Sequence, residues 1–296
     1  MLTDRTRLHI ALQKSGRLSD VSRDLLRDAG FRIQSGKNSL TARVENFPAE
    51  LMFVRDDDIP TFVSDGACEF GIVGRNVLEE FALGQEKAGY EELAELGFGR
   101  CSLKIAAPEA TAYHGPQSLA GQRIATSYPH LVSRFLKQNG VDATVVTMNG
   151  AVELAPRLQI ANFICDLVST GATLEANGLK ALDTVLESQA VLIRTRRPMD
   201  EARAEIASGL MSRIEGVLAT KESKYIMLNA SSEALKRITA LLPGAEAPTI
   251  VPLHGRPGHF AVHAVCQESV FWETLQKLKS AGASAILVVP IEKMML

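Results

Sequence analysis

The sequence predicts an α/β fold in which short buried strands alternate with helices, followed by a smaller carboxyl-terminal domain. Through the first two thirds of the chain, apolar runs of strand length are followed by a polar turn and then by residues with helical spacing. Residues 225–296 follow the order β-α-β-β-α-β, which is typical of a ferredoxin-like sandwich. With 296 residues, the chain is long enough for two or three domains.

The first strand–turn–helix unit carries a polar turn suited to phosphate. An apolar strand over Leu8–Leu12 precedes a helix over Leu18–Ala29, whose apolar residues recur with helical spacing. The turn between them contains Lys14, Ser15, Gly16 and Arg17 at the carboxyl end of the strand, where open α/β sheets bind ligands. A solvated basic turn is the alternative interpretation.

Two more units of this kind follow. We expect strands over 50–54 and 69–74, helices beginning at 59 and 77, and a looser segment over 82–100. Arg55 ends the first of these strands and could face a ligand phosphate. Asp57 or Asp58 is favoured as the N-cap of the next helix, because carboxylates suit the first helical turn.

The central region repeats the pattern. We expect strands over 101–107, 123–126, 142–147 and 164–168, a helix over 131–139 and a short turn of helix over 151–155. The turn Ser127–His130 follows the second of these strands. His130 is interpreted as a helix cap or phosphate contact rather than a metal ligand, because no second histidine stands at ligand spacing.

The stretch Ile164–Leu174 is the most informative in the chain. Asp166 interrupts a buried strand, Ser169–Thr173 supply hydroxyl and backbone N–H groups, and a helix begins after them. Such a loop favours an anion, and Gly171 permits close approach of the backbone. This pattern indicates a site for a phosphorylated sugar. The alternative is an ordinary turn in which Thr170 or Thr173 caps the helix.

The remaining elements complete the α/β part and the last domain. A strand over 190–194 and a long helix over about 200–219 follow the loop. The last domain is expected to contain strands over 225–228, 250–253, 260–265 and 285–289 and helices over 233–242 and 269–281.

Composition excludes several classes of protein. The net charge of −2 provides no electrostatic footprint for nucleic acid. The four cysteines are Cys68, Cys101, Cys165 and Cys266, and their spacing matches neither a metal site nor a redox motif, which suits a reducing compartment. The start, residues 1–7, has no signal-peptide core, and no apolar run reaches membrane-spanning length. We therefore expect a cytoplasmic protein without membrane contact.

Together these stretches resemble the ATP phosphoribosyltransferase family, in its long allosteric form. The matching stretches are Gln13–Leu18, Val54–Pro60, Arg123–Pro129, Asn149–Glu153, Asp166–Leu179 and Glu222–Met227. They run from near the first strand into the last domain, so the resemblance covers essentially the whole chain and is more specific than any single loop.

The resemblance implies a two-lobed catalytic part, like a type II periplasmic-binding protein, and a carboxyl-terminal ferredoxin-like (ACT-like) regulatory domain. The first lobe would comprise residues 1–103 and 187–222, the second 104–186, and the regulatory domain 223–296. The family's long form is inhibited by histidine, with AMP and ADP as candidate further inhibitors, and interconverts between a homodimer and a hexamer. No separate regulatory subunit is expected.

The implied reaction joins ATP to 5-phosphoribosyl 1-diphosphate, giving N1-(5-phospho-β-D-ribosyl)-ATP and diphosphate, with Mg²⁺ held mainly by the substrate and no protein metal ligand assigned. The implied catalytic residues are Lys14, Arg17, Arg55 and Glu153. The implied substrate-binding residues are Ser15, Gly16, Gly74, Ser127, Tyr128, Asp166, Ser169, Thr170, Gly171, Ala172 and Thr173. The implied histidine-binding residues are Asn229, Ala247, Thr249 and Ser284.

Within that assignment, Ser169–Thr173 would hold the 5-phosphate, and Asp166 and Glu153 would accept hydrogen bonds from the ribose. Glu153 facing the adenine is an alternative. Three rival functions stay open on the residues alone: a two-lobed solute-binding module, a phosphoribosyltransferase for another base, and a structural oligomer.

Overall fold

The computed structural model describes residues 6–34, 36, 39–85, 87–221, 223–242, 247–267, 271–292 and 294. The chain divides into two compact units, one of residues 1–24 with 31–206 and the other of residues 25–30 with 207–296. Parts of three expected features lie outside the described residues: the start of the segment 1–7, residue Glu222 of the last matching stretch, and the first residues of the helix expected over 269–281.

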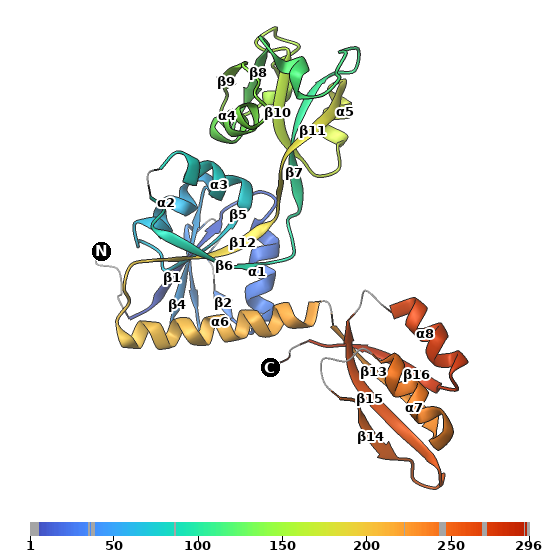
Figure 1. The fold of residues 1–296 in the computed structure, drawn as a ribbon. Coiled ribbons are helices and arrows are strands. Elements are labelled where there is room, and N and C mark those ends of the chain that lie inside the picture. Colours follow the sequence, from blue (N-terminus) through green and yellow to red (C-terminus); the bar gives the residue numbers. More distant parts are fainter. Residues whose placement is uncertain are drawn as a thin grey trace. The chain divides into compact units, whose positions relative to one another are not determined.

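The first lobe of the first unit is built on a seven-stranded sheet in the order β2-β3-β4-β1-β5-β12-β6 (Figure 1). Its strands are β1 (Leu8–Gln13), β2 (Ile33–Gln34), β3 (Thr41–Val44), β4 (Ala49–Val54), β5 (Phe70–Gly74), β6 (Tyr90–Glu95) and β12 (Ala190–Thr195). Its helices are α1 (Ser19–Asp28), the short 3₁₀ turn η1 (Asp56–Asp58), α2 (Ile59–Ser64) and α3 (Arg75–Leu83). Because β1 runs parallel to both β4 and β5, their carboxyl ends share one edge of the sheet.

The second lobe is built on a five-stranded sheet in the order β11-β7-β10-β8-β9. Its strands are β7 (Cys101–Pro108), β8 (Arg123–Thr126), β9 (Thr144–Thr147), β10 (Phe163–Val168) and β11 (Leu179–Ser188). Its helical segments are η2 (Pro116–Leu119), α4 (Pro129–Gln138), η3 (Val152–Leu154) and α5 (Ala172–Ala176).

Successive side chains along these strands point to opposite faces of the second sheet, so each face has its own hydrophobic core. Ile105, Phe163 and Cys165 pack with residues of α4, whereas Ala106 and Ile164 pack with residues of η3 and α5. Both faces are therefore covered, which is why the strands read as continuous apolar runs in the sequence.

The chain passes between the two sheets twice. It enters the second sheet at β7 and leaves it at β11, which pairs with β7 in antiparallel register, and β12 then returns to the first sheet. This arrangement, with the separate small domain described next, confirms the expected fold class: α/β, two lobes like a type II periplasmic-binding protein, and a ferredoxin-like domain.

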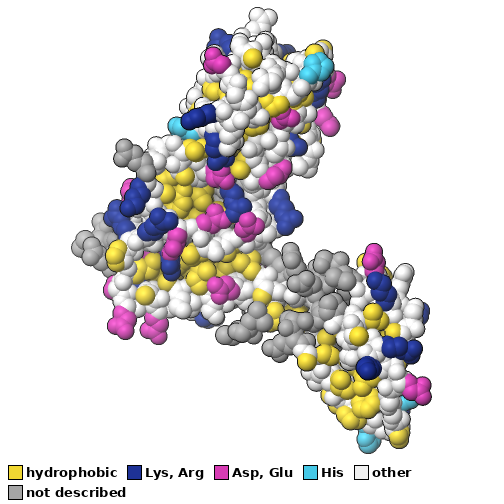
Figure 2. Space-filling model, in the orientation of Figure 1, with side chains coloured by type: hydrophobic (Ala, Val, Ile, Leu, Met, Phe, Trp, Pro, Cys, Tyr) yellow, Lys and Arg dark blue, Asp and Glu magenta, His cyan; other side chains and the backbone are white. Residues whose placement is uncertain are grey.

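The second unit contains α6 (Glu201–Lys221) from residue 207 onward and the small carboxyl-terminal domain. The domain consists of β13 (Ser223–Ser231), α7 (Ser232–Leu241), β14 (Thr249–Pro252), β15 (His259–Gln267), α8 (Phe271–Ser280) and β16 (Ser284–Pro290). Its sheet has the order β14-β15-β13-β16 and is antiparallel throughout, which is the split β-α-β order of a ferredoxin-like fold. Hydrophobic side chains gather on its surface (Figure 2), and its exposed large hydrophobic residues include Ile250, Val251, Leu287 and Val289.

Several strands have no clear signal in the sequence. β2 and β3 are short, and β6 lies at the sheet edge, where its glutamates form ion pairs such as Arg194–Glu91. β11 is mostly half-exposed and carries charged residues, so apolar and polar side chains alternate only weakly along its sequence. The segment 82–100, which was expected to be loose, therefore contains an edge strand.

All four cysteines are free and buried, and no helix in the described ranges is both long and apolar enough to cross a membrane.

A buried ionic network holds the beginning of α6 to the first sheet. Glu69, which is 4% exposed, accepts hydrogen bonds from the His9 backbone N–H at 2.7 Å and from Arg203 Nη1 at 2.7 Å. A buried carboxylate is stable in the folded protein only when its oxygens have such partners.

Replacing Glu69 with Ala should lower the free energy of unfolding by about 3 kcal/mol, because Arg203 and the His9 amide lose their acceptor. Urea unfolding followed by circular dichroism measures this change. The matched control is Glu91→Ala, which breaks the ion pair to Arg194 at a side chain that is 37% exposed and should cost less than about 1 kcal/mol. Equal losses in the two variants would contradict a structural role for the buried network.

Candidate functional site

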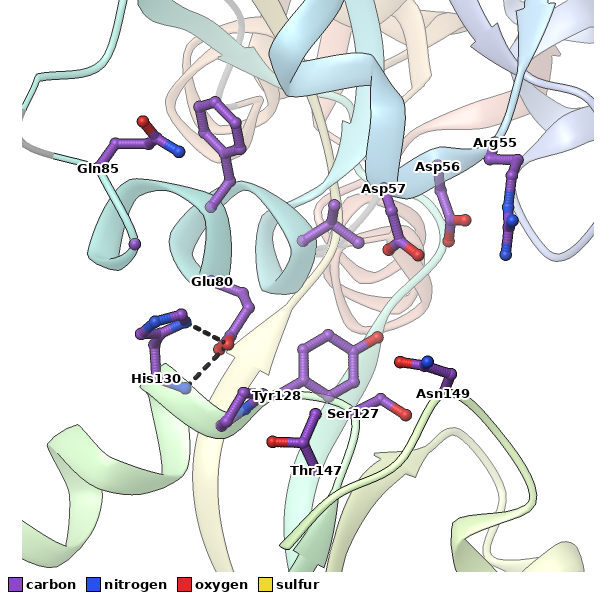
Figure 3. Close-up of a pocket in the computed structure, with 14 residues that line it drawn as sticks. Arg55, Asp56, Asp57, Glu80, Gln85, Ser127, Tyr128, His130, Thr147 and Asn149 are labelled. Carbon is purple, nitrogen blue, oxygen red and sulfur yellow. Dashed lines mark hydrogen bonds and ion pairs between the residues drawn. The ribbon is translucent and has the colours of Figure 1, made fainter. Parts of the chain in front are cut away.

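A cavity of about 620 Å³ lies within the first unit, lined by both lobes (Figure 3). The residues that line it are Arg55, Asp56, Asp57, Val77, Glu80, Phe81, Gly84, Gln85, Ser127, Tyr128, Pro129, His130, Thr147 and Asn149. The first eight belong to the turn after β4, to α3 and to the residues after α3. The rest belong to the turn after β8, to the start of α4, to the end of β9 and to the turn after β9. Ligands of α/β folds bind at such strand ends.

The turn after β4 brings one cation and two carboxylates to the cavity. Arg55 precedes the 3₁₀ turn that contains Asp56 and Asp57, and all three point toward the cavity (Figure 3). Partial burial raises the pKa of Asp57, and the neighbouring Asp56 and Asp58 carboxylates raise it further, while Arg55 lowers it. Asp57 thus lines the cavity and is not the N-cap of α2. Asp58 does occupy the N-cap position of α2, but its side chain makes no capping hydrogen bond.

The second lobe supplies mainly hydroxyl and amide groups. Ser127 and Tyr128 follow β8, and Thr147 and Asn149 end and follow β9. The Tyr128 backbone N–H donates to Thr126 Oγ1 at 2.9 Å, and Ser127 Oγ donates to the Met148 carbonyl at 2.8 Å. These bonds hold both polar turns in place at the carboxyl edge of the sheet.

Glu80 joins the two lobes at the cavity. It extends from α3, and its carboxylate accepts hydrogen bonds from the backbone N–H groups of His130 and Leu131, each at 2.8 Å. The His130 ring Nδ1 is also 2.8 Å from Glu80 Oε1. The start of α4, which has no capping side chain of its own, is thus capped by a carboxylate from the other lobe. Next to this contact, Glu79 pairs with Arg134 at 2.7 Å.

Asp166 and Glu153, the two carboxylates expected at the ribose, lie close enough for their charges to interact, although neither lines the cavity. Asp166 Oδ1 accepts a hydrogen bond from the Leu167 backbone N–H at 2.8 Å. Burial raises the pKa of Asp166, the bond from Leu167 lowers it, and the negative charge of Glu153 raises it again. Two carboxylates with little local compensation are a suitable pair for hydroxyl donors of a ligand.

The loop after β10 is exposed and ends at a glycine. Ser169 and Thr170 are exposed, and Gly171 is the N-cap of α5 with φ of +85°, a conformation that favours glycine. No side chain caps this helix, so the alternative in which Thr170 or Thr173 is the N-cap is wrong. Backbone N–H groups at the start of α5 consequently remain available to a ligand.

The β1–α1 turn is also exposed and does not line the cavity. Arg17 Nη1 donates to the Gly99 carbonyl at 2.6 Å, and Lys14 and Ser15 are exposed. Gly16 has φ of +114°, which accounts for glycine there. Of the residues singled out from the sequence as candidate ligand contacts, the cavity therefore brings together Arg55, Ser127, Tyr128 and His130.

The four expected histidine-binding residues lie in the carboxyl-terminal domain. Asn229 on β13 is paired with Ser284 on β16. Thr249 on β14 is exposed, as is Ala247 before it. Pairing of Thr249 with His263, and of His263 with Met227, places Thr249 and Asn229 on the same face of the sheet.

The sequence pattern did not single out Asp56, Glu80, Gln85, Thr147 or Asn149, all of which line the cavity. Asp56 lies within the acidic run, and Asn149 within the polar turn after β9, so position at a strand end could have indicated them. Glu80 lies within α3, more than one helical turn after the end of β5, where no local signal marks it.

Comparisons with known proteins agree with this geometry. A family model described as ATP phosphoribosyltransferase matches residues 55–216, and a model described as HisG, C-terminal domain, matches residues 220–293. A solved structure described as the ATP phosphoribosyl transferase (HisG:HisZ) complex from Thermotoga maritima is similar at 24% identity and a TM-score of 0.58, over 70% of this chain and 98% of that chain. The alkanesulfonate-binding protein SsuA from Xanthomonas axonopodis pv. citri is similar at 18% identity and a TM-score of 0.47, over 71% and 72% of the two chains.

Asp166→Asn should stabilise the protein at neutral pH. Because the folded state raises the pKa of this carboxyl, its ionised form is less favourable in the folded than in the unfolded chain. The gain in stability should be largest near pH 7, where each kcal/mol raises Tm by about 2–4 °C. It should vanish below about pH 4, where the carboxyl is protonated in both the folded and the unfolded state. Thermal unfolding at the two pH values measures it, with exposed Asp142→Asn as the control. A lower Tm for Asp166→Asn at pH 7 would sink this account.

Proposed function

Since the chain belongs to the ATP phosphoribosyltransferase family, it catalyses the first step of histidine biosynthesis, and we propose that the cavity lined by Arg55, Ser127 and Tyr128 is its active site. The reaction joins ATP and 5-phosphoribosyl 1-diphosphate to form N1-(5-phospho-β-D-ribosyl)-ATP and diphosphate. The observation that carries the proposal is that polar groups at the carboxyl ends of β4, β8 and β9 converge on one cavity (Figure 3).

The chemistry needs positioning and charge compensation rather than proton removal. The attacking adenine N1 carries a lone pair and no proton, so attack needs no general base. As the bond to diphosphate breaks, positive charge develops on the sugar and negative charge on the leaving group. Catalysis therefore depends on aligning N1 with the anomeric carbon and on stabilising the separating charges.

Arg55 is the cation best placed for the phosphate groups, because it lines the cavity. Lys14 and Arg17 would add positive charge from the β1–α1 turn. The guanidinium of Arg17 already donates to the Gly99 carbonyl, which would orient the side chain while leaving other N–H groups for a ligand. The tight backbone at Gly16 would let Ser15 and its neighbours approach phosphate.

The family uses a divalent metal ion, and we propose Mg²⁺ bound chiefly by phosphate oxygens of the substrates. The chemistry of the cavity suits such an ion: Asp56 and Asp57 lie together, and their mutual repulsion contributes to the raised pKa of Asp57. A cation beside these carboxylates would favour their ionised forms. Bound Mg²⁺ would neutralise charge on the departing diphosphate.

The sugar phosphate would occupy the loop after β10. Backbone N–H groups at Gly171, Ala172 and Thr173 lie at the start of α5, where partial positive charge favours an anion. Hydroxyls of Ser169, Thr170 and Thr173 would complete the phosphate contacts. Asp166 and Glu153 would then accept hydrogen bonds from the ribose, with Glu153 facing the adenine as the alternative.

Arg55→Ala should lower kcat/KM about 10²-fold if Arg55 meets charge that develops in the transition state, since each ~1.4 kcal/mol is tenfold. A continuous absorbance assay of adduct formation from ATP, 5-phosphoribosyl 1-diphosphate and Mg²⁺ measures it. The control is Arg157→Ala, an exposed arginine after η3, which should stay within twofold. Wild-type kinetics for Arg55→Ala would remove Arg55 from the site, and no adduct from folded wild-type protein would overturn the proposed function.

The remaining domain assignments are part of the proposal. We place the first catalytic lobe at residues 1–103 and 187–222, the second at 104–186 and the regulatory domain at 223–296, although two of these bounds fall inside β7 and β11 of the second sheet and residues 207–222 belong to the second compact unit. The match of residues 220–293 to the family's carboxyl-terminal domain supports a long-form enzyme that binds histidine, assembles as a dimer or hexamer and needs no separate regulatory subunit. AMP and ADP are proposed as further inhibitors, and the cytoplasm as the location.

Asn229→Ala should raise the histidine concentration needed for half-inhibition at least tenfold, because Asn229 would lose its contacts to the bound amino acid, while kcat without histidine stays unchanged. Inhibition curves of the full chain give both values. The matched control is Thr239→Ala on α7, because the Thr239 hydroxyl donates to the Lys236 carbonyl of its own helix. Unaltered inhibition of Asn229→Ala would remove this residue from the pocket.

A further inference from the structure

We infer that Asn76 is a positioning residue that makes Tyr128 a hydrogen-bond donor to an anionic phosphate oxygen of the substrate. This inference rests on the proposed function, because it requires that substrate phosphates occupy the cavity. Asn76 lies in the first turn of α3 in one lobe, and Tyr128 immediately precedes α4 in the other. Asn76 is only 2% exposed and does not line the cavity, so any effect on the ligand must pass through Tyr128.

The Asn76 amide is held in one orientation by Ser188 at the end of β11. The Asn76 backbone N–H donates to Ser188 Oγ at 3.0 Å, and Ser188 Oγ donates its own proton to Asn76 Oδ1 at 2.8 Å. The hydroxyl thus accepts from one group of Asn76 and donates to another. With Oδ1 committed to Ser188, the Nδ2 group faces the other way, toward Tyr128.

Close packing at Gly74 supports this placement. A Cβ atom built on Gly74 would lie 2.5 Å from Asn76 Oδ1, much closer than real atoms approach. Gly74 has φ of −72°, so the backbone conformation does not itself require glycine. The reason for glycine at this position is the space that the Asn76 amide occupies.

The amide decides which way the phenol proton points. Asn76 Nδ2 donates to the Tyr128 hydroxyl oxygen at 2.9 Å, so that oxygen accepts on the side of α3 and its own proton must point elsewhere. Figure 3 shows the hydroxyl directed into the cavity, toward the side where Asn149 and Asp56 lie. Within the described part of the chain, no hydrogen bond uses this proton. The donor is therefore left for a ligand.

Burial raises the pKa of the Tyr128 phenol, and the nearby negative charges of Asp56, Asp166 and Asp57 raise it further against the opposing effect of Asn76. The phenol thus stays protonated near neutral pH, as a donor requires. In a cavity whose rim carries two carboxylates, a neutral donor of fixed direction can bind a phosphate oxygen without adding charge.

Tyr113 in the same lobe shows the opposite arrangement. Its hydroxyl donates to Asp183 Oδ2 at 2.6 Å, so a carboxylate partner consumes the phenol proton. The Tyr128 hydroxyl accepts a hydrogen bond from the Asn76 amide, whereas the Tyr113 hydroxyl donates one to the Asp183 carboxylate. The identity of the partner, rather than the tyrosine itself, decides whether a ligand receives a donor.

The test is a double-mutant cycle on the full-length protein. Wild type, Tyr128→Phe, Asn76→Ala and the double variant are compared by kcat/KM for adduct formation, and by calorimetric binding of ATP and of inorganic diphosphate, each alone. Tyr128→Phe should weaken kcat/KM and the binding of at least one of these ligands about 10- to 100-fold, as expected for a hydrogen bond to a charged group. Asn76→Ala should cost about fivefold or more in the wild-type background and nothing further in Tyr128→Phe.

Ser188→Ala provides a second route if Asn76→Ala fails to fold. It frees the amide to turn and should cost a few-fold in kcat/KM, again only when Tyr128 is present. The control is Tyr113→Phe, which removes a phenol hydroxyl away from the cavity and should leave kcat/KM and both affinities unchanged.

Two outcomes would overturn the inference. The first is an equal loss from Asn76→Ala, or from Ser188→Ala, with and without the Tyr128 hydroxyl, which is the signature of a merely structural role. The second is unchanged kcat/KM and unchanged affinities in Tyr128→Phe. Both are distinct from failure of the proposed function. If folded wild-type protein forms no adduct but the affinities follow the predicted cycle, the function fails and the donor assignment stands. If adduct forms and the cycle is additive, only the inference fails.

Discussion

The contact between Glu80 and the start of α4 is the interaction on which the candidate site depends. Both carboxylate oxygens accept backbone N–H groups at 2.8 Å, from His130 and Leu131, which no side chain of α4 itself satisfies. Because the carboxylate comes from α3, one hydrogen-bonded cap fixes a helix of the second lobe against a helix of the first. Tyr128, which immediately precedes α4, is positioned in the cavity by this contact together with its bond from Asn76.

This cap also limits how the site can bind anions. A helix N-terminus would ordinarily attract phosphate, yet at α4 that position is taken by the protein's own carboxylate. The start of α5 differs, because its N-cap is Gly171 and no side chain caps it. The two helices of the second lobe that begin at its polar turns are therefore not equivalent, and the contrast supports the loop after β10 as the phosphate site.

As the proposed active site, this cavity would have to accept highly charged substrates although Asp56, Asp57 and Glu80 line it with Arg55. The Glu80 carboxylate is compensated by amide groups and by His130, whereas burial and the neighbouring Asp56 carboxylate raise the pKa of Asp57. The balance has to come from Arg55, from a divalent ion and from neutral donors. Buried partners can orient a neutral hydrogen-bond donor toward the ligand, as Asn76 and Ser188 do for the Tyr128 hydroxyl. Such a donor can bind an anion beside carboxylates.

The sequence by itself determined the alternation of strands and helices, the ferredoxin-like order of the last domain and the family. It also indicated four cavity residues, Arg55, Ser127, Tyr128 and His130. These follow from local signals: apolar periodicity, and polar residues directly after a strand. The edge strands β6 and β11 lacked such periodicity, because charged side chains such as Glu91 and Glu187 have partners on neighbouring strands. Only the tertiary structure decided the roles of Glu80, of Asp57 and of Asn76, whose partner Ser188 is 112 residues away along the chain. A hydrogen bond between residues so far apart leaves no pattern in the sequence around either of them, and it exists only once the two sheets have brought α3, α4 and the end of β11 together.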